Sequence, residues 1–156
     1  MIRYLWVFLI SMVPVLELRA SIPYGAHAGF PWYMVLLVSV IGNLIPVPFI
    51  LLLLEWLLKI MKKIKYLDRF ALWLEARGEK NKVRVQKYAT FGLLLFVGIP
   101  LPGTGAWTGA IVASMLKMNR GRAMLSIAGG VVLAGVIVTL ISYGVLGFLS
   151  FLLTEV

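Results

Sequence analysis

Two ionisable side chains, Glu17 and Arg19, lie inside an apolar stretch near the start of the chain, and they are the residues best suited to chemistry. The surrounding segment, residues 4–30, contains no other Asp, Glu, Lys or Arg. Charged groups inside a membrane segment are costly unless they face a cavity or each other. An arginine fork binds phosphate through two parallel hydrogen bonds, so we expect Arg19 to anchor an anionic substrate group. Glu17 is then the candidate carrier of a proton or a cation, with Ser21 as a neighbouring polar contact. The structural alternative is a local Glu17–Arg19 pair, or Glu17 capping the helix that follows it.

A second candidate site is a run of prolines, glycines and threonines, Pro100-Leu-Pro102-Gly103-Thr104-Gly105-Ala-Trp107-Thr108-Gly109. Glycine frees the backbone, and Thr104 is predicted to cap a helix that begins near residue 105. The unpaired N–H groups at such a helix start bind anions. We therefore expect Thr104, Gly105 and Thr108 to bind substrate. Trp107 is expected to stack on the substrate or to wall it off. The alternative is that the small residues of this run form only a helix-packing stripe.

A third polar residue, Asn43, lies in the motif Gly42-Asn-Leu-Ile-Pro46-Val-Pro48. We expect its amide to bond the backbone groups that the prolines leave unpaired, and we keep it among the substrate-binding candidates. The chain has no Cys and a single His, so we expect neither a metal nor a cofactor. It also has no nucleophile elbow and no P-loop, so we expect no catalytic residues and no enzyme activity.

The segments that must position these residues are those of a polytopic membrane protein. The 156 residues are 62% apolar and 13% charged, and the mean hydropathy is +0.99. Residues 32–54 form an uncharged stretch long enough for one transmembrane helix, which its two prolines should kink. Residues 88–116 are also uncharged, but two crossings would need roughly 40 residues. One crossing would place their basic flanks on opposite sides. We therefore predict a re-entrant hairpin with its tip at the Pro/Gly run, followed by a span at 123–153 that is either one tilted helix or two helices.

The distribution of charge predicts the orientation of these segments. The net charge is +9, and ten of the 15 Lys and Arg residues lie in 59–87. Basic segments beside apolar ones stay on the cytoplasmic side. The apolar spacing within 59–87 predicts an amphipathic helix on that membrane surface and not a nucleic-acid site. Residues 4–30 then form a hairpin that opens to the outside, opposite to the hairpin at 88–116. Small residues of the two hairpins coincide at an offset of 84 positions.

The predicted fold is all-α, with two inverted repeats in one structural unit. Repeat A, residues 1–58, joins a re-entrant hairpin at 4–30 to the span at 32–54. Repeat B, residues 88–156, joins the hairpin at 88–116 to the span at 123–153, and the cytoplasmic linker 59–87 connects the repeats. Secondary transporters commonly have inverted repeats, with substrate held near the membrane midplane. We expect a multi-pass protein of the cell (inner, cytoplasmic) membrane that retains its N-terminal apolar run.

Three motifs resemble those of a known family: Glu-Leu-Arg-Ala-Ser-Ile-Pro-Tyr-Gly at 17–25, Gly-Asn-Leu-Ile-Pro-Val-Pro at 42–48 and Pro-Leu-Pro-Gly-Thr-Gly-Ala-Trp-Thr-Gly-Ala at 100–110. They are similar to motifs of the putative small multi-drug export protein family of bacteria and archaea. That family is similar in turn to the DedA/VTT superfamily, and this resemblance implies re-entrant hairpins and movement of polyprenyl phosphates or phospholipids. DedA-like proteins typically carry acidic residues and an Arg at their hairpins, whereas the second hairpin here has no charge.

These observations predict a transporter or lipid translocase that binds an amphipathic substrate between two opposed hairpin tips. The substrate is expected to carry an anionic head group, such as that of a polyprenyl phosphate, with protons or Na⁺ as candidate coupling ions. One alternative is a multidrug or cation exporter that uses Glu17, and another is a membrane scaffold that transports nothing. The expected partners are membrane lipids and, through the glycine-rich helix faces, a second copy of the chain in a homodimer, but no nucleic acid.

Overall fold

The structure, a computed structural model, describes residues 2–61, 82–101 and 103–154. Among these residues every regular element is a helix, as predicted. The helices are α1 (Ile2–Met12), α2 (Glu17–His27), α3 (Trp32–Leu44), α4 (Pro46–Met61), α6 (Lys82–Gly98), α7 (Ala106–Met115) and α8 (Arg120–Thr154). Most of the predicted amphipathic linker at 59–87 lies outside the described residues.

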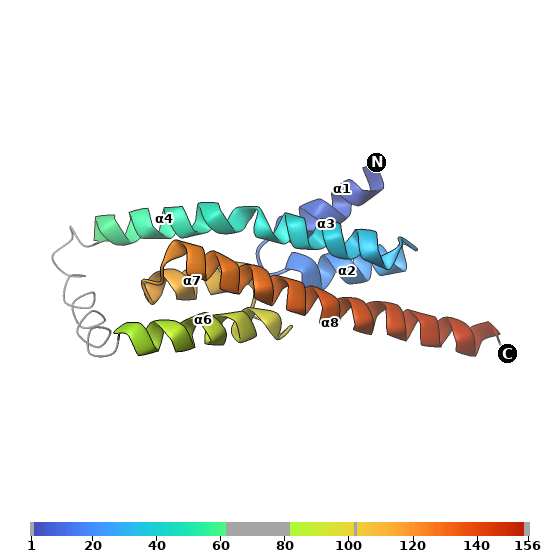
Figure 1. The fold of residues 1–156 in the computed structure, drawn as a ribbon. Helices are drawn as coiled ribbons and strands as arrows, with labels where there is room; N and C mark the ends of the chain where they lie inside the picture. The colour runs from blue at the N-terminus through green and yellow to red at the C-terminus, as the bar shows by residue number, and fades with distance from the viewer. Residues whose placement is uncertain (1, 62–81, 102, 155–156) are drawn as a thin grey trace.

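Two long helical stretches run along the molecule (Figure 1). α3 and α4 follow one another, and the apolar stretch that they share, Trp32–Leu54, has 23 residues. α8 is continuous, and its apolar part, Arg120–Val145, has 26 residues. At 1.5 Å per residue these stretches measure about 35 and 39 Å, more than the roughly 30 Å of membrane hydrocarbon. Both are therefore long and apolar enough to cross a membrane, and the segment predicted at 123–153 is one helix.

The interruption predicted at the prolines falls at Ile45, between α3 and α4. Pro46 has no N–H group, so it cannot donate to the carbonyl four residues before it. Ile45 nevertheless keeps helical backbone angles (φ −57°, ψ −44°), and its N–H donates to the carbonyl oxygen of Ile41 at 3.1 Å. The hydrogen-bond ladder is interrupted, but α4 continues onward from α3 (Figure 1).

The shorter helices form two pairs that occupy opposite halves of the molecule. α1 and α2 pack on each other and on α3, whereas α6 and α7 pack on each other and on α8. In addition, α2 packs on α8 and α7 packs on α4, so each pair also contacts the long stretch of the other half. Figure 1 shows that the reversals of the two pairs come together near the middle of the long axis. This arrangement brings the two predicted sites toward one another.

Small residues let the helices approach one another closely. A Cβ atom added to Gly130 would lie 2.7 Å from the carbonyl oxygen of Leu94, so α8 and α6 meet at the backbone. Ser126 and Ala134, which share this face of α8, are also buried. A Cβ atom added to Gly109 would lie 2.5 Å from the side chain of Val97. The glycine-rich faces that suggested a homodimer are thus used for packing inside one chain, and the homodimer remains a prediction.

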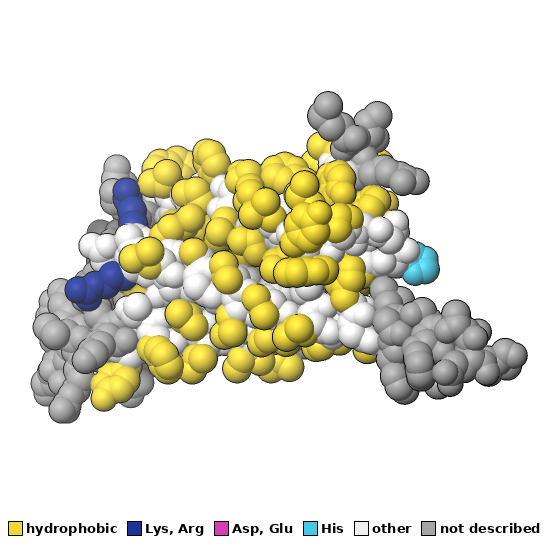
Figure 2. Space-filling view, turned by 45° about the vertical axis from the view of Figure 1, so that its right-hand side comes forward, with side chains coloured by type: hydrophobic (Ala, Val, Ile, Leu, Met, Phe, Trp, Pro, Cys, Tyr) yellow, Lys and Arg dark blue, Asp and Glu magenta, His cyan; other side chains and the backbone are white. Residues whose placement is uncertain are grey.

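The outer surface carries a band of large apolar side chains. Figure 2 shows hydrophobic side chains over the middle of the molecule, Lys and Arg side chains toward one end and the histidine at the other. Phe49, Leu125 and Leu140 are 68%, 74% and 69% exposed. Apolar surface of this extent is rare on soluble monomers and common on membrane proteins. The described part of the chain therefore has both the helices and the surface of a membrane protein.

Candidate functional site where the two turns meet

Two turns face each other at the middle of the molecule. The first turn, residues 13–16, lies between α1 and α2, and the second turn, residues 99–101 and 103–105, lies between α6 and α7. The first turn reverses sharply: Val15 and Glu17 have φ angles of 75° and 47°, which are unusual for residues other than glycine. Such angles persist only where surrounding contacts hold them, and the contacts of Glu17 and Arg19 with the second helix pair provide this support.

Glu17 caps a helix of the opposite pair. Its side chain is 4% exposed. Its carboxylate accepts hydrogen bonds from the backbone N–H groups of Ala106 at 3.3 Å and Trp107 at 3.2 Å. These donors belong to the first turn of α7, where the cap residue supplies no side-chain bond of its own. The carboxylate also lies at the positive end of the α7 dipole. The acid therefore caps α7, not the helix that follows it in the sequence.

Gly105 allows this close approach. A Cβ atom at this position would lie 2.1 Å from the Oε2 atom of Glu17, a distance that no real side chain could tolerate. The φ angle of Gly105 is also 154°, a value that side chains disfavour. Both its backbone angle and its space therefore require glycine, and its role in substrate binding remains a prediction.

Arg19 binds the second turn itself. One guanidinium nitrogen donates to the carbonyl oxygen of Leu101, and another donates to the Oγ1 atom of Thr104 at 2.7 Å. The Thr104 hydroxyl also lies 2.8 Å from the carbonyl oxygen of Ile99 and 2.9 Å from that of Leu101, so its own proton is directed back into the turn. The prediction that Thr104 caps α7 is therefore wrong: Thr104 stabilises the turn and accepts from Arg19, and Glu17 supplies the cap.

Asn43 lies beside these two residues without a hydrogen-bond partner. Its side chain is fully buried, and neither its Nδ2 nor its Oδ1 atom is bonded among the described residues. The buried Nε atom of Arg19 is also unpaired there. The expectation that Asn43 bonds the backbone beside Pro46 is therefore wrong. Asn43, Glu17, Arg19 and Gly105 line one crevice that is too narrow to hold a water molecule.

Three other predicted residues lie beside this cluster. The hydroxyl of Ser21 donates to that of Ser39 at 2.7 Å in a buried contact between α2 and α3, so Ser21 ties two helices together. The indole N–H of Trp107 donates to the carbonyl oxygen of Met12 at 3.3 Å, which fixes α7 against the end of α1. Trp107 takes part in the cluster through its backbone N–H, which donates to Glu17. Thr108 is half-buried and does not line the crevice.

Sequence reasoning missed the direct bonding between the two predicted sites. The first turn of α7, which begins at Ala106 and Trp107, has no acidic residue, so this helix start lacks a local anion. An isolated acid such as Glu17, in another apolar segment, is the natural partner for these N–H groups. The pairing could have been proposed from these two signals. The hydrogen bond from Arg19 to the Leu101 carbonyl could not have been proposed, because any backbone carbonyl can accept a hydrogen bond.

The cluster is suited to binding charged groups. It combines one carboxylate at a helix N-terminus, one guanidinium with an unused N–H, and one amide with an unused donor and acceptor. Among the described residues no group of three or more His, Cys, Asp or Glu side chains could hold a metal ion. Charge-assisted hydrogen bonds are the chemistry that the carboxylate and the guanidinium offer here.

Comparison with known proteins identifies the family of the chain. No curated protein and no solved structure matches it. The model of one family, described as "Putative small multi-drug export protein", matches residues 17–137. This match includes Glu17, Arg19, Asn43 and the whole second turn, and it extends through most of the apolar part of α8. The chain is therefore a helical membrane protein that belongs to the putative small multi-drug export protein family.

Proposed function

We propose that this protein is a transporter or lipid translocase for amphipathic molecules with an anionic head group, such as a phosphate. The observation that carries the proposal is the position of Glu17, whose carboxylate occupies the N-terminus of α7. A helix N-terminus is a binding site for phosphate and other anions. Glu17 therefore occupies the place that a substrate head group would take, and it acts as an internal substitute for that group.

In the proposed exchange, the head group replaces Glu17 at the N–H groups of Ala106 and Trp107. Protonation of Glu17 removes its negative charge and weakens its hold on the helix start. The released N–H groups, together with the unused Nε atom of Arg19 and the amide of Asn43, can then bind phosphate oxygens. Proton uptake by Glu17 would in this way be linked to substrate binding.

The arrangement described above corresponds to the closed form in this proposal. Arg19 and Glu17 contribute four of the hydrogen bonds between the two halves: two from the guanidinium of Arg19 and two to the carboxylate of Glu17. The crevice between them is too narrow for water, so a head group can enter only after these contacts separate. The break at Ile45 and the sharp first turn are places where the backbone could accommodate such a movement.

The packing of the helices supports two inverted re-entrant repeats. Each helix pair packs on its own long stretch and sends its second helix, α2 or α7, against the long stretch of the other half. The buried positions of these second helices also correspond, at an offset one helical turn longer than the predicted 84: residues 18, 21, 22, 25 and 26 in α2 and residues 106, 109, 110, 113 and 114 in α7. We propose a multi-pass protein of the cell membrane whose basic segment 59–87 faces the cytoplasm.

The test compares an anionic and a cationic amphiphile of equal chain length. Dodecyl phosphate and dodecyltrimethylammonium are titrated into purified protein in lipid nanodiscs, and the dissociation constants are measured by calorimetry. We expect wild-type protein to bind dodecyl phosphate, and Arg19→Ala to weaken this binding about 10-fold to 100-fold, the value of a charge-assisted hydrogen bond. Arg122→Ala removes an exposed arginine at the start of α8 with the same change in charge, so it is the matched control and should bind normally.

Three results would contradict the proposal. Equal losses in Arg19→Ala and Arg122→Ala would mean that only overall charge matters. Binding of the cation alone, unaffected by Arg19→Ala and abolished by Glu17→Gln, would identify a cation exporter. No binding of either amphiphile by wild-type protein would favour a scaffold. Arg19→Lys, which keeps the charge without the planar fork, serves in place of Arg19→Ala if the alanine variant unfolds.

A further inference from the structure

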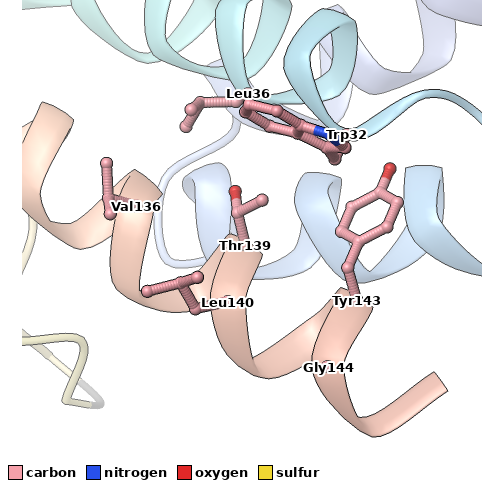
Figure 3. A pocket seen from close by; sticks show the side chains of 7 residues that line it. All are labelled: Trp32, Leu36, Val136, Thr139, Leu140, Tyr143 and Gly144. Atoms are coloured by element: carbon pink, nitrogen blue, oxygen red, sulfur yellow. The ribbon is translucent and has the colours of Figure 1, made fainter. Parts of the chain in front are cut away.

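An apolar groove lies between α3 and α8, away from the crevice at Glu17. The groove has a volume of about 320 Å³. Figure 3 shows Trp32 and Leu36 of α3 on one side, with Val136, Leu140 and Tyr143 of α8 on the other. Trp32 is 54% exposed and Leu140 is 69% exposed, so the groove is open toward the surroundings of the protein. A hydrocarbon chain is the ligand that such a lining favours.

One buried hydroxyl in this lining has no partner. Thr139 is 6% exposed, and its Oγ1 atom is unbonded among the described residues. In the same helix, the hydroxyl of Ser126 donates to the carbonyl oxygen of Arg122, four residues earlier, at 2.9 Å. Thr139 makes no such bond. Figure 3 shows the hydroxyl of Thr139 directed toward Trp32 and Leu36 across the groove. A buried donor without an acceptor is costly, so this hydroxyl indicates that the ligand carries an acceptor.

The surroundings of the groove indicate its depth. Tyr143 lies one helical turn beyond Thr139, and its hydroxyl donates to the carbonyl oxygen of Phe30 at 2.7 Å, beside the start of α3. Trp and Tyr side chains gather where membrane hydrocarbon meets the polar region. The hydroxyl of Thr139 is one turn farther into the membrane than Tyr143, so it would lie at the depth where the ester groups of glycerolipids join their acyl chains. The apolar residues Leu36 and Val136 then line the path of the chain.

We propose that this groove binds one acyl chain of a membrane glycerophospholipid, with the ester carbonyl accepting a hydrogen bond from Thr139. The ester carbonyl is an acceptor without a proton, which is the group that an unpaired hydroxyl donor requires. The open side of the groove admits the chain from the surrounding bilayer. This site is independent of the proposed exchange at Glu17, since neither Glu17 nor Arg19 lines it.

The test measures the lipid that remains bound to the protein. Full-length protein is transferred from vesicles of dipalmitoyl phosphatidylglycerol into mild detergent, and bound phospholipid is counted by native mass spectrometry. Gly144 lines the groove, and a Cβ atom there would meet nothing within 4 Å, so Gly144→Leu adds a bulky side chain at the groove without a clash at its Cβ atom. Gly92 in α6 has equally open space outside the groove, so Gly92→Leu is the matched control. We expect Gly144→Leu to lose the bound phospholipid and Gly92→Leu to retain it.

The role of the hydroxyl is tested with a second lipid. Thr139→Val keeps the shape of the side chain, and a dialkyl ether analogue of the same lipid lacks the ester carbonyl. We expect Thr139→Val to weaken retention of the ester lipid about fivefold, the effect of one hydrogen bond, and to leave retention of the ether lipid unchanged. Equal loss in Gly144→Leu and Gly92→Leu would overturn the proposal, as would equal effects of Thr139→Val on both lipids. A wild-type dimer that Gly144→Leu dissociates, with no lipid bound, would instead assign the groove to a second copy of the chain.

Discussion

The carboxylate of Glu17 lies against the backbone of Gly105, and this contact between the two halves gives the residue-scale prediction. A methyl group at residue 105 would collide with Oε2 of Glu17, at 2.1 Å. Gly105→Ala must therefore move Glu17 away from α7 or distort the second turn. We expect a loss of about 1–3 kcal/mol in the free energy of unfolding and a lower thermal midpoint in detergent.

The control at this scale is Gly103→Ala. Gly103 has a positive φ of 82°, but a Cβ atom there would meet nothing within 4 Å. The Gly103→Ala variant therefore introduces backbone strain without a collision with Glu17. If Gly103→Ala lowers the thermal midpoint as much as Gly105→Ala does, the contact with Glu17 is not what makes glycine necessary.

At the scale of the elements, two adjacent glycines in α8 make a matched pair. A Cβ atom on Gly130 would lie 2.7 Å from the carbonyl oxygen of Leu94, a backbone atom that cannot move without shifting α6. A Cβ atom on Gly129 would meet only the flexible end of the Leu94 side chain, at 3.0 Å. We expect Gly130→Ala to destabilise the fold by about 1–3 kcal/mol and Gly129→Ala to be neutral or slightly stabilising, because alanine favours helix. Equal thermal midpoints for the two variants would show that α6 does not pack on α8 in this register.

The elements also show how far the sequence alone could predict this protein. The apolar stretches of α3, α4 and α8 and the turn at residues 99–105 could be predicted, because length, charge and proline act locally. The hydrogen bonds that Arg19 donates to Leu101 and Thr104 could not, because they join residues more than 80 positions apart. Ser21 was predicted for the site because it is polar, but Ser39 satisfies its hydroxyl, and the sequence contains no sign of that pairing.

At the scale of the whole molecule, the ends of the two short helix pairs lie at opposite ends of the long axis (Figure 1). The end of α2 at His27 and the end of α7 at Leu116 should therefore face opposite sides of the membrane. The chain has no natural Cys, so the single variants His27→Cys and Leu116→Cys can be labelled in oriented vesicles with a reagent that does not cross the bilayer. We expect each to react from one side only, and the two sides to differ. Labelling of both from the same side would contradict the two inverted hairpins.

The measurement that tests the central claim most directly is proton uptake when dodecyl phosphate binds. Calorimetry in two buffers with different ionisation heats gives the number of protons that wild-type protein and Glu17→Gln take up. Glutamine keeps the shape of the side chain but cannot take up a proton, and protons taken up by the ligand itself cancel in the comparison. If Glu17 leaves α7 as a protonated acid, wild-type protein takes up more protons than Glu17→Gln, and Glu17→Gln binds the phosphate more tightly. Equal proton uptake, with binding no tighter in Glu17→Gln, would show that Glu17 only holds the two turns together.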